Sequence, residues 1–340
     1  MADPPRLFVL TAALVLGLVP RLMATETAKT ALSDDQRLLL GAAREIADSV
    51  ADRVWPGWGR AEFEILLVTA EREILLGGSR RPEGFTSGVV LPVLGQTAER
   101  PRRFPPSLLA TMPAFGLPPT VVLGTPEATG LGPTQWLQVL LHEHFHQWQM
   151  RDPGYYEATE GLDLAAGDTT GRWMLEYAFP YDDEELGRSW ARLSRELAML
   201  LRRPRGEDLA PGAAVFWRHY GDYEHQLRPA DARYFGFQLW QEGVARFVEL
   251  RVAQEAAAGW VPPLALAGRP GFEDFSTAAC AAWEELFEEL ETPDLAGRRR
   301  ISFYAVGAGM AMLLDRTEPA WKGRYEMPRF TLAPTVSNAR

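Results

Sequence analysis

The sequence predicts an α+β protein with an N-terminal sheet-containing lobe and a C-terminal helical lobe. The segments 63–68, 73–76, 88–94 and 120–123 are short and mostly apolar, which is typical of strands. From Thr134 onward, apolar residues recur instead at helical spacing. The chain has 340 residues, 46% hydrophobic and 24% charged, which is typical of a globular protein able to bury a sizeable core.

In the first lobe, residues 33–53 predict an amphipathic helix, because Leu39, Ala42 and Ile46 fall on one side of it. The four predicted strands follow this helix. Proline and glycine punctuate residues 101–119, so we expect a loop there with one edge strand. These elements define a sheet-containing lobe over residues 25–133.

In the second lobe, Pro133 suits the first turn of a helix that runs to about residue 151. Further helices are expected in the segments 184–203, 230–257, 276–290 and 301–315. The helix from Thr134 therefore lies at the junction of the two lobes. Ligand sites are common at such junctions.

The N-terminus is typical of a secretory signal. Arg6 precedes an apolar run over residues 7–19, and Leu22-Met23-Ala24 offers a cleavage site. We expect residues 1–24 to be a signal peptide and residues 25–340 to form a secreted or periplasmic protein. An uncleaved membrane anchor is the alternative. No other apolar run approaches transmembrane length, so no stable membrane insertion is expected after cleavage.

Charge and cysteine content limit the partners and the cross-links that this chain can have. The formal net charge is −10, which argues against nucleic acid or anionic membranes as partners. Cys280 is the only cysteine, so no internal disulfide can form, and its small-residue surroundings predict a buried position. The arginine clusters at 202–205 and 298–300 are expected to be solvated helix ends. A chain of this length needs no metal to fold, so a metal site would be functional.

Three of the five histidines lie in the segment His142-Glu143-His144-Phe145-His146, an H-E-x-x-H pattern on a predicted helix. The i, i+4 spacing puts His142 and His146 on one face, where both imidazoles can bind one Zn²⁺ ion. Glu143 is offset by about 100° and can act as general base toward a zinc-bound water. His144 points away and is expected to be a core or surface residue.

A catalytic zinc requires a third protein ligand. Asp152, six residues after His146, is one candidate. Some H-E-x-x-H families place a ligand there after a sharp glycine turn, but Gln149 occupies the glycine position. Asp152 also precedes Pro153 and has the character of a residue that ends a helix.

Glu242 is the second candidate for the third ligand. It shares a predicted helical face with Gln238, Arg246 and Glu249. A polar stripe on an otherwise apolar helix needs a buried partner or solvent, and a zinc centre would be such a partner. The alternative is an exposed ion pair between Glu242 and Arg246.

The segment His142-Glu143-x-x-His146-Gln147-Trp148, followed by Leu239-Trp240-Gln241-Glu242-Gly243-Val244-Ala245, resembles the gluzincin metallopeptidases. Among them it is most similar to the membrane-alanyl-type and the PDZ-containing glycyl aminopeptidases. The resemblance implies a zincin-like fold, Glu242 as third ligand and Glu249 as hydrogen-bond acceptor for a ligand histidine. This chain has one residue fewer before the glutamate than the L-W-x-x-E-G pattern, and residues 152–235 would be an insertion.

Residues 301–307 resemble the Y-x-K-G helix start of the same families. The resemblance implies that Tyr304 stabilises the oxyanion of the tetrahedral intermediate. Val306 stands where the family has lysine, and a tyrosine that only packs is the alternative. The G-x-M-E-N segment that holds a free amino terminus is absent, so aminopeptidase specificity does not carry over.

The segment 217–225 crowds aromatic and ionisable groups ahead of the predicted third-ligand helix. Tyr223, His225 or the nearby Tyr234 can contact substrate if the segment faces the site. A polar–aromatic surface loop is the alternative.

Together these features predict an exported zinc metallopeptidase that hydrolyses peptide or protein substrates with a zinc-activated water. The alternatives are a zinc-dependent hydrolase of a non-peptide substrate and an exported zinc-binding protein without turnover. Glu143 argues against the last, because a site that only binds metal needs no base beside its ligands.

Overall fold

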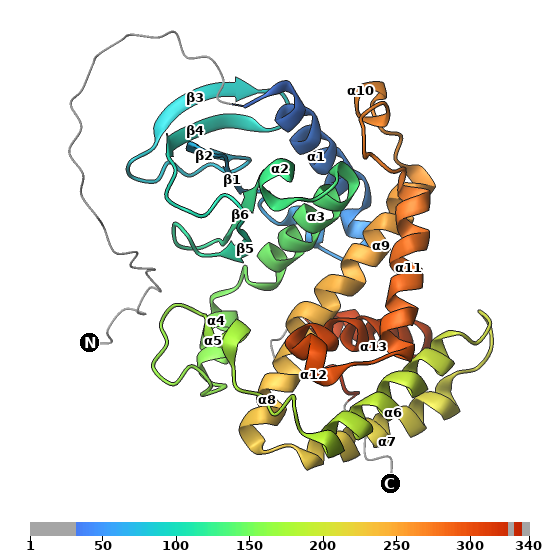
Figure 1. Cartoon of the computed structure of the whole chain (residues 1–340). Coiled ribbons are helices and arrows are strands. Elements are labelled where there is room, and N and C mark those ends of the chain that lie inside the picture. Colours follow the sequence, from blue (N-terminus) through green and yellow to red (C-terminus); the bar gives the residue numbers. More distant parts are fainter. Residues whose placement is uncertain (1–31, 326–329, 335–340) are drawn as a thin grey trace.

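The computed structural model describes residues 32–325 and 330–334 and has an α+β fold, as the sequence predicts. The sheet and its covering helices form one end of the molecule, and helices alone form the other (Figure 1). The predicted signal peptide lies outside the described residues. Among the helices that are described, none has the length and apolar character needed to cross a membrane.

The six-stranded mixed sheet comprises β1 (Ile65–Val68), β2 (Arg72–Leu76), β3 (Thr86–Leu91), β4 (Gly95–Pro101), β5 (Leu109–Met112) and β6 (Thr120–Gly124). The strand order is β3-β4-β2-β1-β6-β5, with β1 and β6 parallel and the other pairs antiparallel. The edge strand expected within 101–119 is β5. β4 was not predicted, because its charged residues mask the strand pattern; Arg100 is buried there and pairs with Glu73 at 2.6 Å.

The two faces of the sheet are covered differently. Helices α1 (Asp34–Val54) and α3 (Pro133–Gln149) cover one face and share a large core with Leu67 and Leu123. The opposite face buries a smaller cluster that includes Leu66, Leu75 and Val122 under aromatic loop residues. α3 therefore has one side against the sheet and contacts α9 with another.

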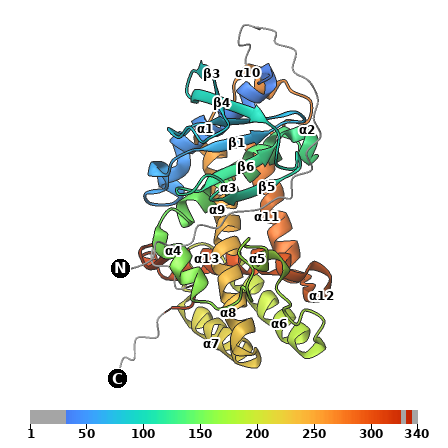
Figure 2. The ribbon, with the colours of Figure 1, turned by 90° about the vertical axis from the view of Figure 1, so that its left-hand side faces the viewer.

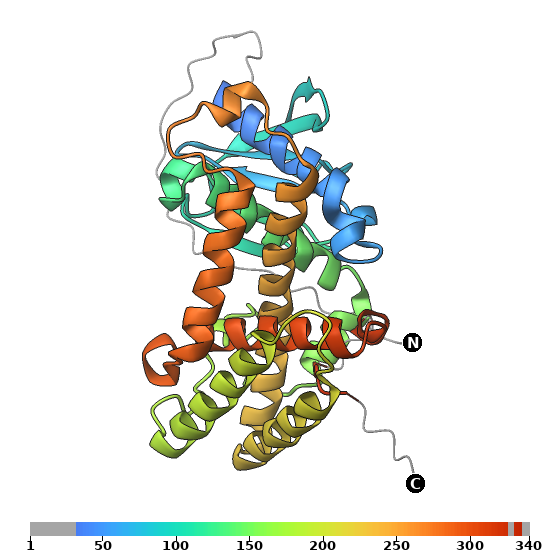
Figure 3. The same ribbon diagram turned by 90° about the vertical axis from the view of Figure 1, so that its right-hand side faces the viewer.

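The remaining described helices are short connectors or belong to the helical end (Figure 2). They are η1 (Trp58–Arg60), α2 (Pro126–Thr129), α4 (Pro153–Glu160), α5 (Trp173–Glu176), α6 (Glu184–Leu201), α7 (Ala210–Gln226), α8 (Pro229–Gln238), η2 (Leu239–Gly243), α9 (Val244–Gly259), α10 (Leu264–Ala267), α11 (Phe275–Glu291), α12 (Leu295–Arg298), η3 (Arg299–Ile301), α13 (Ser302–Thr317) and α14 (Trp321–Tyr325). α9 and α11 run side by side from the sheet to the helical end, where α13 crosses them (Figure 3).

Two expectations about local structure are wrong. The segment 217–225 is part of helix α7, whose buried Phe216, Tyr220 and Tyr223 have helical spacing. Cys280 is exposed on α11 and is not buried, because it lies two residues from the buried Ala278 and Ala282 and so on the opposite face of the helix. The predicted helical stretch 230–257 is confirmed as α8 and α9, with a π turn, η2, between them.

Neither Tyr223 nor Tyr234 is available to a substrate from solvent, because both are buried. The Tyr234 hydroxyl donates to the Met174 carbonyl at 3.1 Å. His225 is exposed in the last turn of α7. Within the described residues, none of the three makes a hydrogen bond or ion pair with His142 or His146, although burial and the Glu242 carboxylate both raise the pKa of Tyr234.

Candidate metal centre

Two helices bring the predicted ligand residues together. His142 and His146 lie one turn apart on α3, and their Nε2 atoms are 3.2 Å apart. Glu242, in the π turn η2, places Oε2 3.8 Å from His142 Nε2 and 3.6 Å from His146 Nε2. The three donor atoms thus form a compact triangle between residues that are about a hundred positions apart in the sequence.

The triangle has the size that a zinc ion requires. Donors about 2.0–2.1 Å from a tetrahedral ion lie about 3.3 Å from one another. The separations of 3.2, 3.6 and 3.8 Å are close to this value. Two imidazoles and one carboxylate are also a donor set that zinc takes in catalytic sites. The residues therefore fit the metal in chemistry and in spacing.

The other ring nitrogen of His142 faces a carboxylate. Its Nδ1 lies 3.2 Å from Glu249 Oε2, and Arg246 holds Glu249 through a 2.6 Å bond. A carboxylate acceptor keeps the proton on Nδ1 and leaves Nε2 free to bind a metal. Arg246 pairs with Glu249 and with Glu285, so the proposed Glu242–Arg246 ion pair is absent from these contacts.

Gln149 has the same role for His146, and sequence reasoning missed it. Its amide nitrogen donates to the carbonyl oxygens of Gln241 at 2.9 Å and Trp240 at 3.3 Å. The amide oxygen therefore faces His146 Nδ1 as an acceptor, and the Gln241 side-chain nitrogen lies 3.0 Å from the same ring nitrogen. Gln149 follows His146 by three residues on the same helix, and this i, i+3 spacing was the available signal.

Glu143 lies next to the triangle and is held by the edge strand. The donor atoms of His142, Glu143 and His146 all lie within 4.8 Å of one another. The Thr111 hydroxyl in β5 is 2.8 Å from Glu143 Oε2 and 2.7 Å from the Glu143 carbonyl oxygen. Glu143 is thus fixed beside the triangle by a contact with the sheet.

Tyr304 in α13 reaches the opposite side of Glu242. Its hydroxyl bonds to Arg300 and interacts with the Glu242 carboxylate. Burial, with Glu242 next, raises the pKa of Tyr304 well above its usual value. Tyr304 is therefore a neutral hydrogen-bond donor at neutral pH.

The triangle stabilises positive charge. Burial alone would lower the pKa of His142, but the carboxylates of Glu242 and Glu249 outweigh it and raise the pKa to about 10. Burial would raise the pKa of Glu242, yet His146 and His142 hold it well below the usual range. A buried site that stabilises positive charge between two imidazoles is suited to a divalent metal ion.

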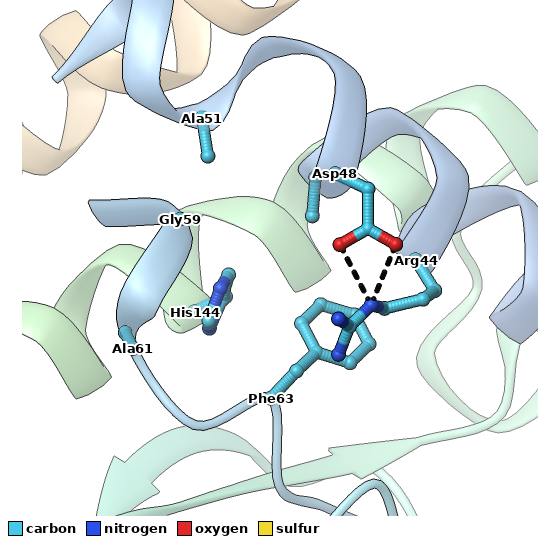
Figure 4. Close-up of a pocket in the computed structure, with 8 residues that line it drawn as sticks. Arg44, Asp48, Ala51, Gly59, Ala61, Phe63 and His144 are labelled. Carbon is cyan, nitrogen blue, oxygen red and sulfur yellow. Dashed lines mark hydrogen bonds and ion pairs between the residues drawn. The ribbon is translucent and has the colours of Figure 1, made fainter. Parts of the chain in front are cut away.

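The other sequence candidates lie elsewhere. Asp152 is exposed and caps α4, accepting a 2.7 Å bond from the Gly154 backbone. His144 lies on the back of α3, as expected, in a small pocket lined by Phe63 and by the Arg44–Asp48 ion pair (Figure 4). Burial lowers the pKa of His144 to about 4, so it stays neutral.

The π turn accounts for one further difference. Gln238 was expected to share a face with Glu242, because four residues make about one turn of an α-helix. An i→i+5 turn at Leu239–Gly243 breaks that spacing. Gln238 consequently donates to the Met174 carbonyl at 2.7 Å, while Glu242 faces the histidines. π turns are frequent at functional sites.

Comparison with known proteins finds no match to this chain among protein families, curated proteins or solved structures. The site must therefore be interpreted from its own geometry.

Proposed function

We propose that this chain is an exported zinc-dependent metallopeptidase with a zincin-like fold. The convergence of His142 Nε2, His146 Nε2 and Glu242 Oε2 beside Glu143 is the observation that carries the proposal. These three residues would hold the metal. The acceptor oxygens of Glu249 and Gln149 beside the Nδ1 atoms of His142 and His146 support this assignment, because histidines that bind metals usually have such partners.

The chemistry follows from the positions of Glu143 and Tyr304. A bound zinc supplies Lewis acidity, which polarises a carbonyl and lowers the pKa of water. Glu143 accepts a proton from the attacking water and passes it to the leaving amine. The neutral Tyr304 hydroxyl donates a hydrogen bond to the oxygen on which negative charge develops. Thr111 keeps the Glu143 carboxylate in place through the 2.8 Å contact.

The position of β5 favours a peptide over other substrates. β5 ends the sheet and pairs only with β6 within the described part of the chain. Its outer side therefore offers backbone donors and acceptors beside the residue that holds Glu143. An extended peptide can pair with such an edge and so pass the metal centre. A small non-peptide substrate would gain nothing from this edge.

Metal content and cleavage test the proposal together. The full chain, expressed with its signal, is purified and its zinc content measured by elemental analysis. Wild type, Glu143→Gln and the control Glu127→Gln, which changes an exposed residue of α2, are then incubated with a casein digest and a peptide library. We expect one zinc per chain in all three and cleavage by wild type and the control alone.

Each alternative predicts a different result. A zinc-binding protein without turnover would hold one zinc and cleave no substrate class. A non-peptide hydrolase would cleave ester or amide substrates in a Glu143-dependent way but leave peptides intact. Wild type that lacks zinc would overturn the metal assignment itself.

A further inference from the structure

The three consecutive arginines 298–300 have different surroundings, although the sequence suggests one solvated cluster. Arg298 pairs with Glu289, and Arg299 pairs with Asp182. Arg300 is partly buried and bonds to the Tyr304 hydroxyl. Within residues 32–325 and 330–334, no carboxylate lies at ion-pair distance from the Arg300 guanidinium. Arg300 is thus a partly buried cation whose bonded partner is a neutral phenol.

Arg300 faces the metal centre. The Tyr304 hydroxyl interacts with both Arg300 and Glu242, so it links the guanidinium to the predicted third ligand. Burial would lower the pKa of Arg300, but its interactions with Tyr304 and Glu242 raise it. The guanidinium is always charged at neutral pH. The Tyr304 side chain therefore lies between this positive charge and Glu242, the predicted third ligand.

The backbone turn before α13 separates Arg300 from its neighbour. Arg299 has φ 49° and ψ −131°, a conformation that residues other than glycine rarely adopt. Its side chain lies over the Tyr181 ring at 5.0 Å and reaches Asp182. The next residue, Arg300, reaches Tyr304. Strained backbone of this kind persists where the surrounding structure demands it and is enriched at functional sites.

We propose that Arg300 binds a carboxylate of the substrate and so selects peptides that carry a negative charge near the cleaved bond. This inference rests on the proposed peptidase function. A guanidinium has five N–H donors arranged as a fork that matches a carboxylate in a bidentate manner. The Tyr304 hydroxyl bonds to Nη1, which leaves most of the fork available. The same hydroxyl serves the reacting carbonyl, so the bound carboxylate lies close to that carbonyl.

The carboxylate can be a free C-terminus or an acidic side chain, and two libraries distinguish these sources. Zinc-loaded Glu143→Gln protein is incubated with a random N-acetylated tetrapeptide library in acid form or in amide form. Retained peptides are identified by mass spectrometry. Enrichment of the acid form over the amide form indicates a C-terminal carboxylate. Enrichment of Asp and Glu within the amide library indicates a side chain.

Variants of Arg300 then test whether this side chain is responsible for the retention of the enriched peptides. In the Glu143→Gln background, Arg300→Gln should reduce retention of the enriched peptides about 10- to 100-fold, since a charged hydrogen bond is lost. Uncharged members of the amide library should bind as before. Arg300→Lys should recover part of the loss, because charge remains but the fork is gone. Arg299→Gln is the matched control and should leave retention unchanged.

Other results would overturn the inference. If Arg300 only positions Tyr304, then Arg300→Gln and Tyr304→Phe would weaken the binding of peptides with and without a carboxylate alike. Equal retention of peptides with and without a carboxylate, or no retention of any peptide, would also rule it out. Cleavage by wild type tests the proposed function separately. Cleavage without preference for a carboxylate would refute the role of Arg300 alone, and retention without cleavage would refute the peptidase alone.

Discussion

Gly243 in the π turn and Gly307 in α13 bring two backbones into direct contact. A Cβ atom added at Gly243 would lie 2.5 Å from the Gly307 Cα, and one added at Gly307 would lie 2.7 Å from the Gly243 Cα. Only glycine allows so close an approach. The contact sets the distance between Glu242, on the π turn, and Tyr304, on α13.

Gly307→Ala should therefore disturb both stability and the metal centre. The added methyl meets backbone atoms, including the Leu239 carbonyl oxygen at 2.8 Å, so a helix must move. Overpacking of this kind costs about 1–3 kcal/mol. We expect a lower free energy of unfolding in urea and weaker zinc binding. Gly221→Ala is the control, because a Cβ there meets nothing within 4 Å in helix α7. Equal stability of the two variants would contradict the prediction.

Glu249→Gln should weaken metal binding without unfolding the protein. The neutral amide no longer stabilises positive charge on His142 through the 3.2 Å contact. Loss of such an outer partner typically reduces metal affinity about 10- to 100-fold. Competition with a chromophoric zinc chelator measures the change. Glu285→Gln removes the other, more exposed partner of Arg246 and should leave the affinity close to that of wild type.

Thr111→Val should lower kcat and leave zinc content unchanged. Valine has the shape of threonine but cannot make the 2.8 Å hydrogen bond to Glu143 Oε2. A base that is less well held should slow proton transfer about 10-fold, given what one hydrogen bond to a charged group contributes. Thr111→Ser restores the hydroxyl and should recover most of the rate. The prediction fails if serine and valine have the same effect.

Asp274 gives a pH-dependent prediction away from the site. Its carboxylate caps α11 and bonds to Ser276 and Thr277, whose side chains and backbone lower the pKa of Asp274 to about 2. A lowered pKa in the folded state stabilises the fold above the usual pKa, near 4, and the stabilisation is lost as pH falls toward 2. The stability difference between wild type and Asp274→Ala should thus be larger at pH 6 than at pH 3. Urea unfolding at both values checks this. A difference that does not change with pH would contradict it.

The sequence predicted the α+β architecture because the strands β1, β2 and β6 each contain a run of three or four apolar residues and the helices have clear periodicity. The sequence did not predict strand β4 or helix α7, and the reason differs between the two. β4 buries Arg100 in an ion pair with Glu73 of β2. The hydrophobic pattern of β4 alone does not show that a partner on another strand neutralises this charge. α7 contains closely spaced aromatic and polar residues. Without knowledge of the surface that buries its aromatic side chains, this composition is also compatible with a loop.

At the site, local spacing was enough for His142, Glu143 and His146, because one helix determines their geometry. The polar face of its helix made Glu242 a candidate, but assigning it as the third ligand in place of Asp152 needed the family resemblance, since a contact across about a hundred residues has no local signal. Arg300 was misjudged as solvated for the same reason. The turn at Arg299 that separates it from its neighbours depends on the packing of α12 and α13.

The π turn also has a consequence for how this centre can change. Each residue of an α-helix turns the chain by about 100°. Deleting one residue from Leu239–Gly243 would restore a regular α-helix and rotate all of α9 relative to α8 by roughly that angle. Glu249 and Arg246 would then point away from the histidines, although no side chain had been substituted. The length of this one turn is therefore as strict a requirement for the centre as the identity of its ligands.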